Sequence, residues 1–200
     1  MAEGKEPGSF GIHPYKIIVY LFVGGITALF LAFSFAYLYS RIQHGTPAIK
    51  VPLIFVFNAI ILILSSVVLV KAKSYYRQDK TAKYKHALLF TIVLTILFLI
   101  GQFYGWNELF KQKIPVDHNQ GASYLYLISG VHFLHVIAGM PFLVLFYSTA
   151  LREMVDPVTV LLYFSDPEKK LKLELLTFYW HFLDLLWIYL VIFFVVNSLL

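Results

Sequence analysis

Five apolar stretches, each long enough to cross a lipid bilayer, constrain what this chain can fold into. A hydrocarbon core of about 30 Å requires roughly 20 helical residues at 1.5 Å each. In this 200-residue chain 60% of the residues are hydrophobic and only 14% are charged. We therefore predict an all-α integral membrane bundle of five transmembrane helices. The expected spans are residues 16–40, 51–71, 86–106, 122–150 and 172–200.

The basic residues between these spans predict the orientation. Loops rich in Lys and Arg remain on the cytoplasmic side, and here twelve such residues fall on the side of the N-terminus and four on the other. We expect residues 1–15 to form a cytoplasmic tail, residues 16–200 to form one domain, and the C-terminus to be external. The tail lacks the pattern of a cleaved signal peptide, so the first span should be retained. Loops that meet lipid headgroups explain the formal net charge of +5, and no nucleic-acid partner is expected.

The chain contains no cysteine, which excludes several kinds of redox centre from it. Disulfides, thiolate metal sites, iron–sulfur clusters and a cysteine-ligated dinuclear copper centre all need this residue. Any such cofactor must belong to a partner.

The last span places ionisable side chains inside an apolar run. At about 100° per residue, Glu174, Thr177, His181 and Asp184 share one helix face, which must look into the bundle because such groups are costly in lipid. Asp184 needs a partner, and histidine or tryptophan N–H groups of the fourth or fifth span are candidates. Two interpretations of Glu174 remain open. It takes up protons, or it is a carboxylate at the N-terminus of the span, stabilised by the helix dipole and by the lysines at positions 170 and 172.

The fourth span carries His132 and His135, which are neighbours on one side of a helix. Imidazole is a common metal and haem ligand, yet a histidine pair in a membrane helix is more often a hydrogen-bonded packing group. Together with His181 these are too few ligands for two haems and a copper. The spacing of Gly101 and Gly105 in the third span favours close helix packing.

Several motifs resemble subunit III of the haem-copper cytochrome oxidases. The order Glu174, then Tyr-Trp-His-Phe at 179–182, then Asp184 and Trp187, is similar to the last helix of that family. The fourth span, with Ser-Gly at 129–130, the two histidines and Gly139, is similar to its penultimate helix. Further matches are Pro52, Asn58, the serines at positions 65 and 66, and Gln102. The resemblance extends over residues 16–200.

This resemblance implies an accessory subunit of a proton-pumping terminal oxidase in a bacterial cytoplasmic membrane. Five spans fit a short form of the family that lacks the first two of seven helices, which an extended subunit I then supplies. Dioxygen would be reduced to water at haem and copper on subunit I, with electrons entering through subunit II or from quinol. This chain would carry no catalytic residue, metal or redox cofactor. It would pack against subunit I beside subunit II and other respiratory subunits, bind phospholipid, and support stability and proton uptake.

The resemblance also selects candidate residues, none of them catalytic. Those expected to form a polar interior are Glu174, His181, Asp184, His132, His135 and Gln102. Those expected to pack are Tyr179, Trp180, Trp187, Gly130 and Gly139. The chain departs from the family at two places. The glutamate usual in the first of these spans would fall at Gly25 or Ile26, and the glutamate that often follows the third-span glutamine is Gly105.

Three other functions remain as alternatives. One is a related accessory protein of a nitric oxide reductase. Another is an independent proton or ion carrier that uses Glu174 and Asp184. The third is a free-standing membrane metalloenzyme that uses His132, His135 and His181.

Overall fold

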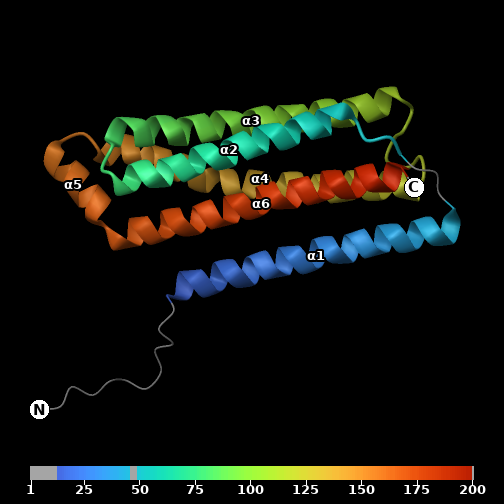
Figure 1. Cartoon of the computed structure of the whole chain (residues 1–200), viewed down its shortest axis with the longest axis horizontal. Helices are drawn as coiled ribbons and strands as arrows, with labels where there is room; N and C mark the ends of the chain where they lie inside the picture. Colours follow the sequence, from blue (N-terminus) through green and yellow to red (C-terminus); the bar gives the residue numbers. More distant parts are fainter. Residues whose placement is uncertain (1–12, 46–48, 200) are drawn as a thin grey trace, which may run out of the picture.

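The computed structural model describes residues 13–45 and 49–199, which form six helices (Figure 1). The helices are α1 (Pro14–His44), α2 (Leu53–Arg77), α3 (Thr81–Lys111), α4 (Gln120–Glu153), α5 (Pro157–Ser165) and α6 (Pro167–Leu199). All except α5 are long and apolar enough to cross a membrane. The predicted all-α architecture with five spans is confirmed. Most of the expected tail, residues 1–15, lies outside the described residues, and the orientation of the termini stays a prediction.

The helices extend beyond the predicted spans at nearly every end. The basic segment 71–85, predicted to be a loop, is helical except for residues 78–80. The predicted loop 151–172 is also wrong, because it contains α5 and the first turns of α6. Local capping explains this second error. Asp156 and Thr159 form a capping box at the start of α5, and Pro157 occupies its first turn.

Successive long helices run in alternating directions, as short connections require (Figure 1). Helices α2 and α3 form the most extensive pair, and α6 packs against both α2 and α4. Helix α1 lies at the edge of the bundle, where its main contacts are with α4 and α6. Helix α5 crosses the end of the bundle at which α1 begins (Figure 1).

Glycine allows the closest helix approach, between α2 and α3. A Cβ atom added to Gly105 would collide with the ring of Phe55, and one added to Gly101 would collide with the amide of Asn58. Both partners are fully buried, so neither has space to retreat. The predicted packing role of this glycine pair is confirmed.

We expect Gly105→Ala to destabilise the bundle by about 1–3 kcal/mol, because the new methyl group overpacks the contact with Phe55. Thermal unfolding in detergent, followed by circular dichroism, measures the change. Gly24→Ala is the matched control, since nothing lies within 4 Å of an added Cβ there. Equal melting temperatures for the two variants would contradict the packing role of Gly105.

Candidate functional site

Polar side chains of α6 meet α2 along a seam, which we define by Glu174, His181, Trp180 and Trp187 on α6. The carboxylate of Glu174 accepts a hydrogen bond from Arg77 Nη2 at 2.9 Å and lies 3.9 Å from Lys73 Nζ. Its ion partners therefore come from α2 and not from lysines of its own helix. Because α6 begins at Pro167, Glu174 lies two turns inside the helix, and its interpretation as a helix-terminal carboxylate is wrong.

Further along the seam, each contact joins α6 to a polar group of α2. The His181 ring forms a hydrogen bond with the Ser66 hydroxyl. Trp180 Nε1 donates to the Ser65 hydroxyl at 3.3 Å, and Trp187 Nε1 donates to the Phe55 carbonyl at 3.2 Å. The prediction that the ionisable face of this helix looks into the bundle is confirmed. Both indole rings are almost completely buried there.

Asp184 differs from its neighbours, because neither of its carboxylate oxygens has a hydrogen-bond partner among the described residues. Its exposed fraction is 3%. The expected histidine or tryptophan donor is therefore not found. The amides of Asn58 and Gln102, both fully buried, also have no partner in the described part of the chain. With His132 Nδ1 of α4, four helices thus carry buried polar atoms that have no hydrogen-bond partner within these residues.

The two histidines of α4 point to different neighbours. His132 is fully buried, with Nε2 3.1 Å from the Leu183 carbonyl and its ring centroid 5.0 Å from that of Trp187. His135 instead bonds the Val131 carbonyl of its own helix at 2.7 Å, and its ring faces Phe30 of α1. Their separate hydrogen bonds favour packing over shared metal ligation. Across residues 13–45 and 49–199, no three His, Cys, Asp or Glu side chains are grouped to hold a metal ion.

Gly139 permits close contact between α4 and α6. An added Cβ would lie 2.9 Å from both the Trp180 and Tyr179 rings. Tyr179 also donates its hydroxyl to the His135 carbonyl at 3.0 Å. Gly130, predicted to pack similarly, has nothing within 4 Å of an added Cβ, so no close contact within this chain requires it.

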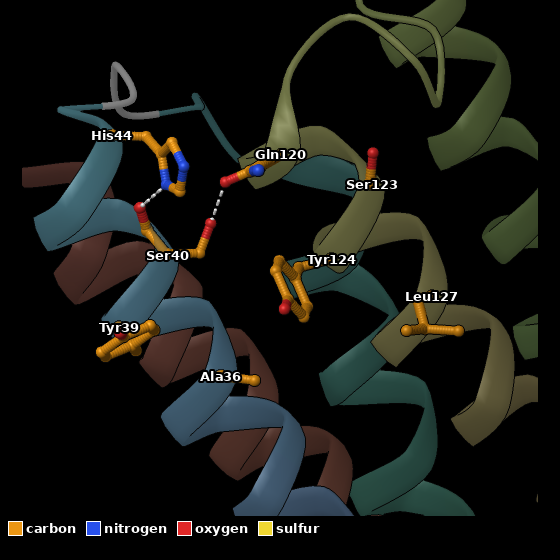
Figure 2. A pocket seen from close by; sticks show the side chains of 8 residues that line it. All are labelled: Ala36, Tyr39, Ser40, His44, Gln120, Ser123, Tyr124 and Leu127. Carbon is orange, nitrogen blue, oxygen red and sulfur yellow. Dashed lines mark hydrogen bonds between the residues drawn. The ribbon is translucent and has the colours of Figure 1, made fainter.

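At the other end of the bundle, a pocket of about 510 Å³ with several polar residues in its lining lies between α1 and α4 (Figure 2). The Ser40 hydroxyl donates to Gln120, and the His44 ring lies 3.0 Å from the Ser40 carbonyl. Beside the pocket, Arg41 donates to the backbone and side-chain oxygens of Asn197. The Ser40–Gln120 and Arg41–Asn197 contacts hold α1 against α4 and α6 at this end. We did not predict them from the sequence, because each partner is a single polar residue far away in the chain.

At the opposite end, α1, α4 and α6 border an apolar groove of about 660 Å³. Its walls include Phe22 of α1, Phe142 of α4 and Leu176 of α6. Lys169 and Lys172 are the cationic residues of its lining. The groove can accept an apolar chain that carries an anionic group at one end.

Comparison with known proteins adds a second line of observation. A sequence model of the family described as "Cytochrome c oxidase subunit III" matches residues 12–198. The chain belongs to this family. It is 33% identical over 196 residues to "Cytochrome c oxidase subunit 3" of Synechocystis, an alignment that covers 94% of this chain and 78% of the relative.

Other members of the family are longer than the part that this chain matches. Identity to "Probable cytochrome c oxidase subunit 3" of Rickettsia prowazekii is 31%, over 66% of this chain and 44% of the relative. Identity to the mouse "Cytochrome c oxidase subunit 3" is 30%, over 71% of this chain and 48% of the relative. The chain therefore spans about half the length of these two relatives. Members of the family generally hold neither haem nor copper.

We expect the Trp180–Ser65 hydrogen bond to contribute about 0.5–1.5 kcal/mol to the stability of the seam. A double-mutant cycle of Trp180→Phe and Ser65→Ala, measured by thermal unfolding, isolates this coupling. A parallel cycle that pairs Trp180→Phe with Ser123→Ala is the control, because Ser123 bonds only backbone carbonyls near its own helix. Additive effects in the first cycle would show that the contact does not stabilise the protein.

Proposed function

We propose that this chain is an accessory subunit that braces the catalytic subunit of a respiratory terminal oxidase, supports proton uptake and holds phospholipid. Its membership of the cytochrome c oxidase subunit III family places it in an oxidase complex with subunits I and II. One observation carries the proposal for its role. Four family-motif side chains of α6, those of Glu174, Trp180, His181 and Trp187, form hydrogen bonds with α2.

A bracing role is consistent with a bundle whose polar groups hold its helices together and whose outer faces are apolar and exposed. The seam and the glycine contacts fix α2, α3, α4 and α6 to one another. Large apolar side chains such as Leu21, Phe35 and Leu145 remain exposed along the outer faces of the spans. In a membrane these faces meet lipid or the helices of other subunits. We propose that part of this surface packs directly against subunit I.

The groove between α1, α4 and α6 supports the lipid part of the proposal. Its walls are apolar over most of their length, as an acyl chain requires. Lys172 is exposed at the groove, where its ammonium group can meet a phosphate. Lys169 is paired with Glu153 and Lys172 with Glu168, but the Lys172 side chain is the more exposed of the two, at 47% against 26%. We therefore propose that the lipid phosphate is bound by the ammonium group of Lys172.

Glu174 and Asp184 are the residues through which we propose that the chain supports proton uptake. Both lie on α6, separated by about 15 Å of helix rise. Glu174 is half-buried between Arg77 and Lys73, near the basic end of the bundle, whereas Asp184 is buried near its middle. Intramembrane carboxyls often mark proton relays, and Asp184 has no hydrogen-bond partner among the described residues. We propose that these groups support, and do not replace, the proton path of subunit I.

Purification from the native membrane with a tag on this chain tests the proposal as a whole. We expect a large haem-bearing subunit to copurify, with oxygen-consuming activity and a reduced-minus-oxidised haem spectrum. A chain that stays alone in mild detergent, where other respiratory complexes remain intact, would overturn the accessory role.

For the lipid groove, we expect Ala138→Phe to lower the amount of phospholipid that copurifies with the complex, because the new ring fills the space for an acyl chain. Lipid mass spectrometry of the purified oxidase measures this. Ala32→Phe is the matched control, since Ala32 is exposed on α1 and does not line the groove. The same lipid content in both variants would count against the groove as the site.

For proton uptake, we expect Glu174→Gln to leave the complex assembled but to hasten the loss of activity during turnover, because the amide cannot carry a proton. Oxygen consumption recorded over many turnovers measures the rate of loss. Glu108→Gln is the control, because Glu108 is exposed near the opposite end and bonds only Gln112. A complex that fails to assemble would show instead that the bond to Arg77 is structural.

A further inference from the structure

The short helix α5 exposes a compact apolar face that the accessory role does not explain. Val158, Leu161 and Leu162 lie on one side of the helix, at the i, i+3 and i+4 spacing, and Val155 lies just before the N-cap residue Asp156. Their exposed fractions are 70%, 66%, 67% and 72%, respectively. Within α5 itself no charged residue interrupts this face.

The opposite side of α5 is fixed to the bundle, so the apolar face cannot turn inward. Tyr163 is buried, and its carbonyl accepts a hydrogen bond from the Tyr76 hydroxyl at 2.9 Å. Its own hydroxyl lies 3.4 Å from that of Tyr84. Burial raises the pKa of the Tyr163 phenol above its usual range, so the group stays a neutral hydrogen-bonding hydroxyl. The Phe164 ring packs edge-on against Tyr76 at 5.1 Å.

The connections of α5 keep it at the ends of two membrane spans. Three residues, 154–156, separate it from α4, and the single residue Asp166 separates it from α6. An extended chain covers at most about 3.6 Å per residue, so α5 cannot move far from the level at which α4 and α6 end. Figure 1 shows it crossing that end of the bundle.

Basic residues surround α5 at this level. Arg152 precedes it, Lys170 follows it, and Lys83 is next to its packing partner Tyr84, and all three are exposed. Among the described residues, none of the three forms an ion pair. Acidic residues are also present: Glu153 and Asp166 lie next to Lys169, Glu168 pairs with Lys172, and Asp156 caps the start of α5. Arg152, Lys170 and Lys83 are thus exposed cations that no described carboxylate pairs with directly.

We propose that α5 lies in the headgroup region of the bilayer and inserts its apolar face into a leaflet that contains anionic phospholipid. An apolar face beside free cations, held parallel to the membrane surface, is the arrangement by which interfacial helices bind anionic lipid. The aliphatic side chains enter the acyl boundary, while Arg152, Lys170 and Lys83 meet phosphate groups. This surface is separate from the groove between α1, α4 and α6, and the inference does not depend on the lipid proposed there.

A fluorescent probe on α5 tests its position in the intact complex. The chain has no native cysteine, so Leu161→Cys provides a single site on this subunit for an environment-sensitive dye. The labelled oxidase is placed in nanodiscs. Oxidase that contains the unaltered chain is treated with the same dye, and its signal is subtracted to correct for dye bound to partner subunits. We expect strong quenching by lipids with a nitroxide near the headgroup, weaker quenching by lipids labelled deep in the chain, and little quenching by iodide. Val158→Cys repeats the measurement, should Leu161→Cys disturb assembly.

Two matched positions calibrate the quenching. Leu134→Cys, exposed in the middle of the α4 span, should respond most to the deep nitroxide, and Asp117→Cys, exposed in the loop before α4, should respond to iodide. An α5 probe that iodide quenches would overturn the proposal, because it would place the face in water. A probe that no quencher reaches would also overturn it, by showing that another subunit covers the face.

The anionic part of the proposal has its own measurement. A nitroxide at the same depth on an anionic carrier lipid should quench the α5 probe about twofold more than one on a zwitterionic lipid, since the three cations enrich anionic lipid locally. The excess should fall in the triple variant Lys83→Gln, Arg152→Gln, Lys170→Gln. Equal quenching by the two carriers would show that α5 inserts without selecting anionic lipid.

Discussion

The hydrocarbon core of a bilayer offers no hydrogen-bond partner, so polar side chains inside it must bond to other parts of the protein. In this chain the seam between α6 and α2 provides such bonds. Spanning helices satisfy their own backbones, but the side chains of a polar face must find partners on another helix. Helix α2 supplies them with two serines, a backbone carbonyl and two cations. The remaining helices are arranged around this pair. Helix α3 packs on α2 through glycines, and α4 packs on α6 through Gly139.

The seam also explains why bulky aromatic and ionisable residues occur together in α6. An indole ring fills much of the space between helices and has one N–H group that a serine or a free carbonyl can accept. Trp180 and Trp187 both use this capacity toward α2. Asp184, about one turn before Trp187, is buried, and its carboxylate oxygens have no hydrogen-bond partner among the described residues. The same helix face thus combines hydrogen-bonded structural groups with one buried carboxyl.

The number and position of the spans could be predicted from the sequence, because apolar length and helical rise determine them. The inward direction of the α6 face followed from its angular spacing. The partners of that face could not be predicted, since the apolar residues of α2 show no clear period and its few polar residues, among them Ser65 and Ser66, do not indicate which neighbour they contact. Helix α5 was missed because charged residues flank a run shorter than any span. The Asp-Pro pairs at 156–157 and 166–167 were the available signal, as each begins a helix.

The peripheral position of α1 has a consequence for how the protein is made. Its partners are distant in sequence, since Gln120 follows Ser40 by 80 residues and Asn197 follows Arg41 by 156. During synthesis α1 enters the membrane before its main neighbours α4 and α6 have been translated. It must therefore remain in lipid without these contacts until α4 and α6 are inserted. The surface of α1 can remain in contact with lipid during this time, because it is apolar nearly all the way round and carries no acidic residue.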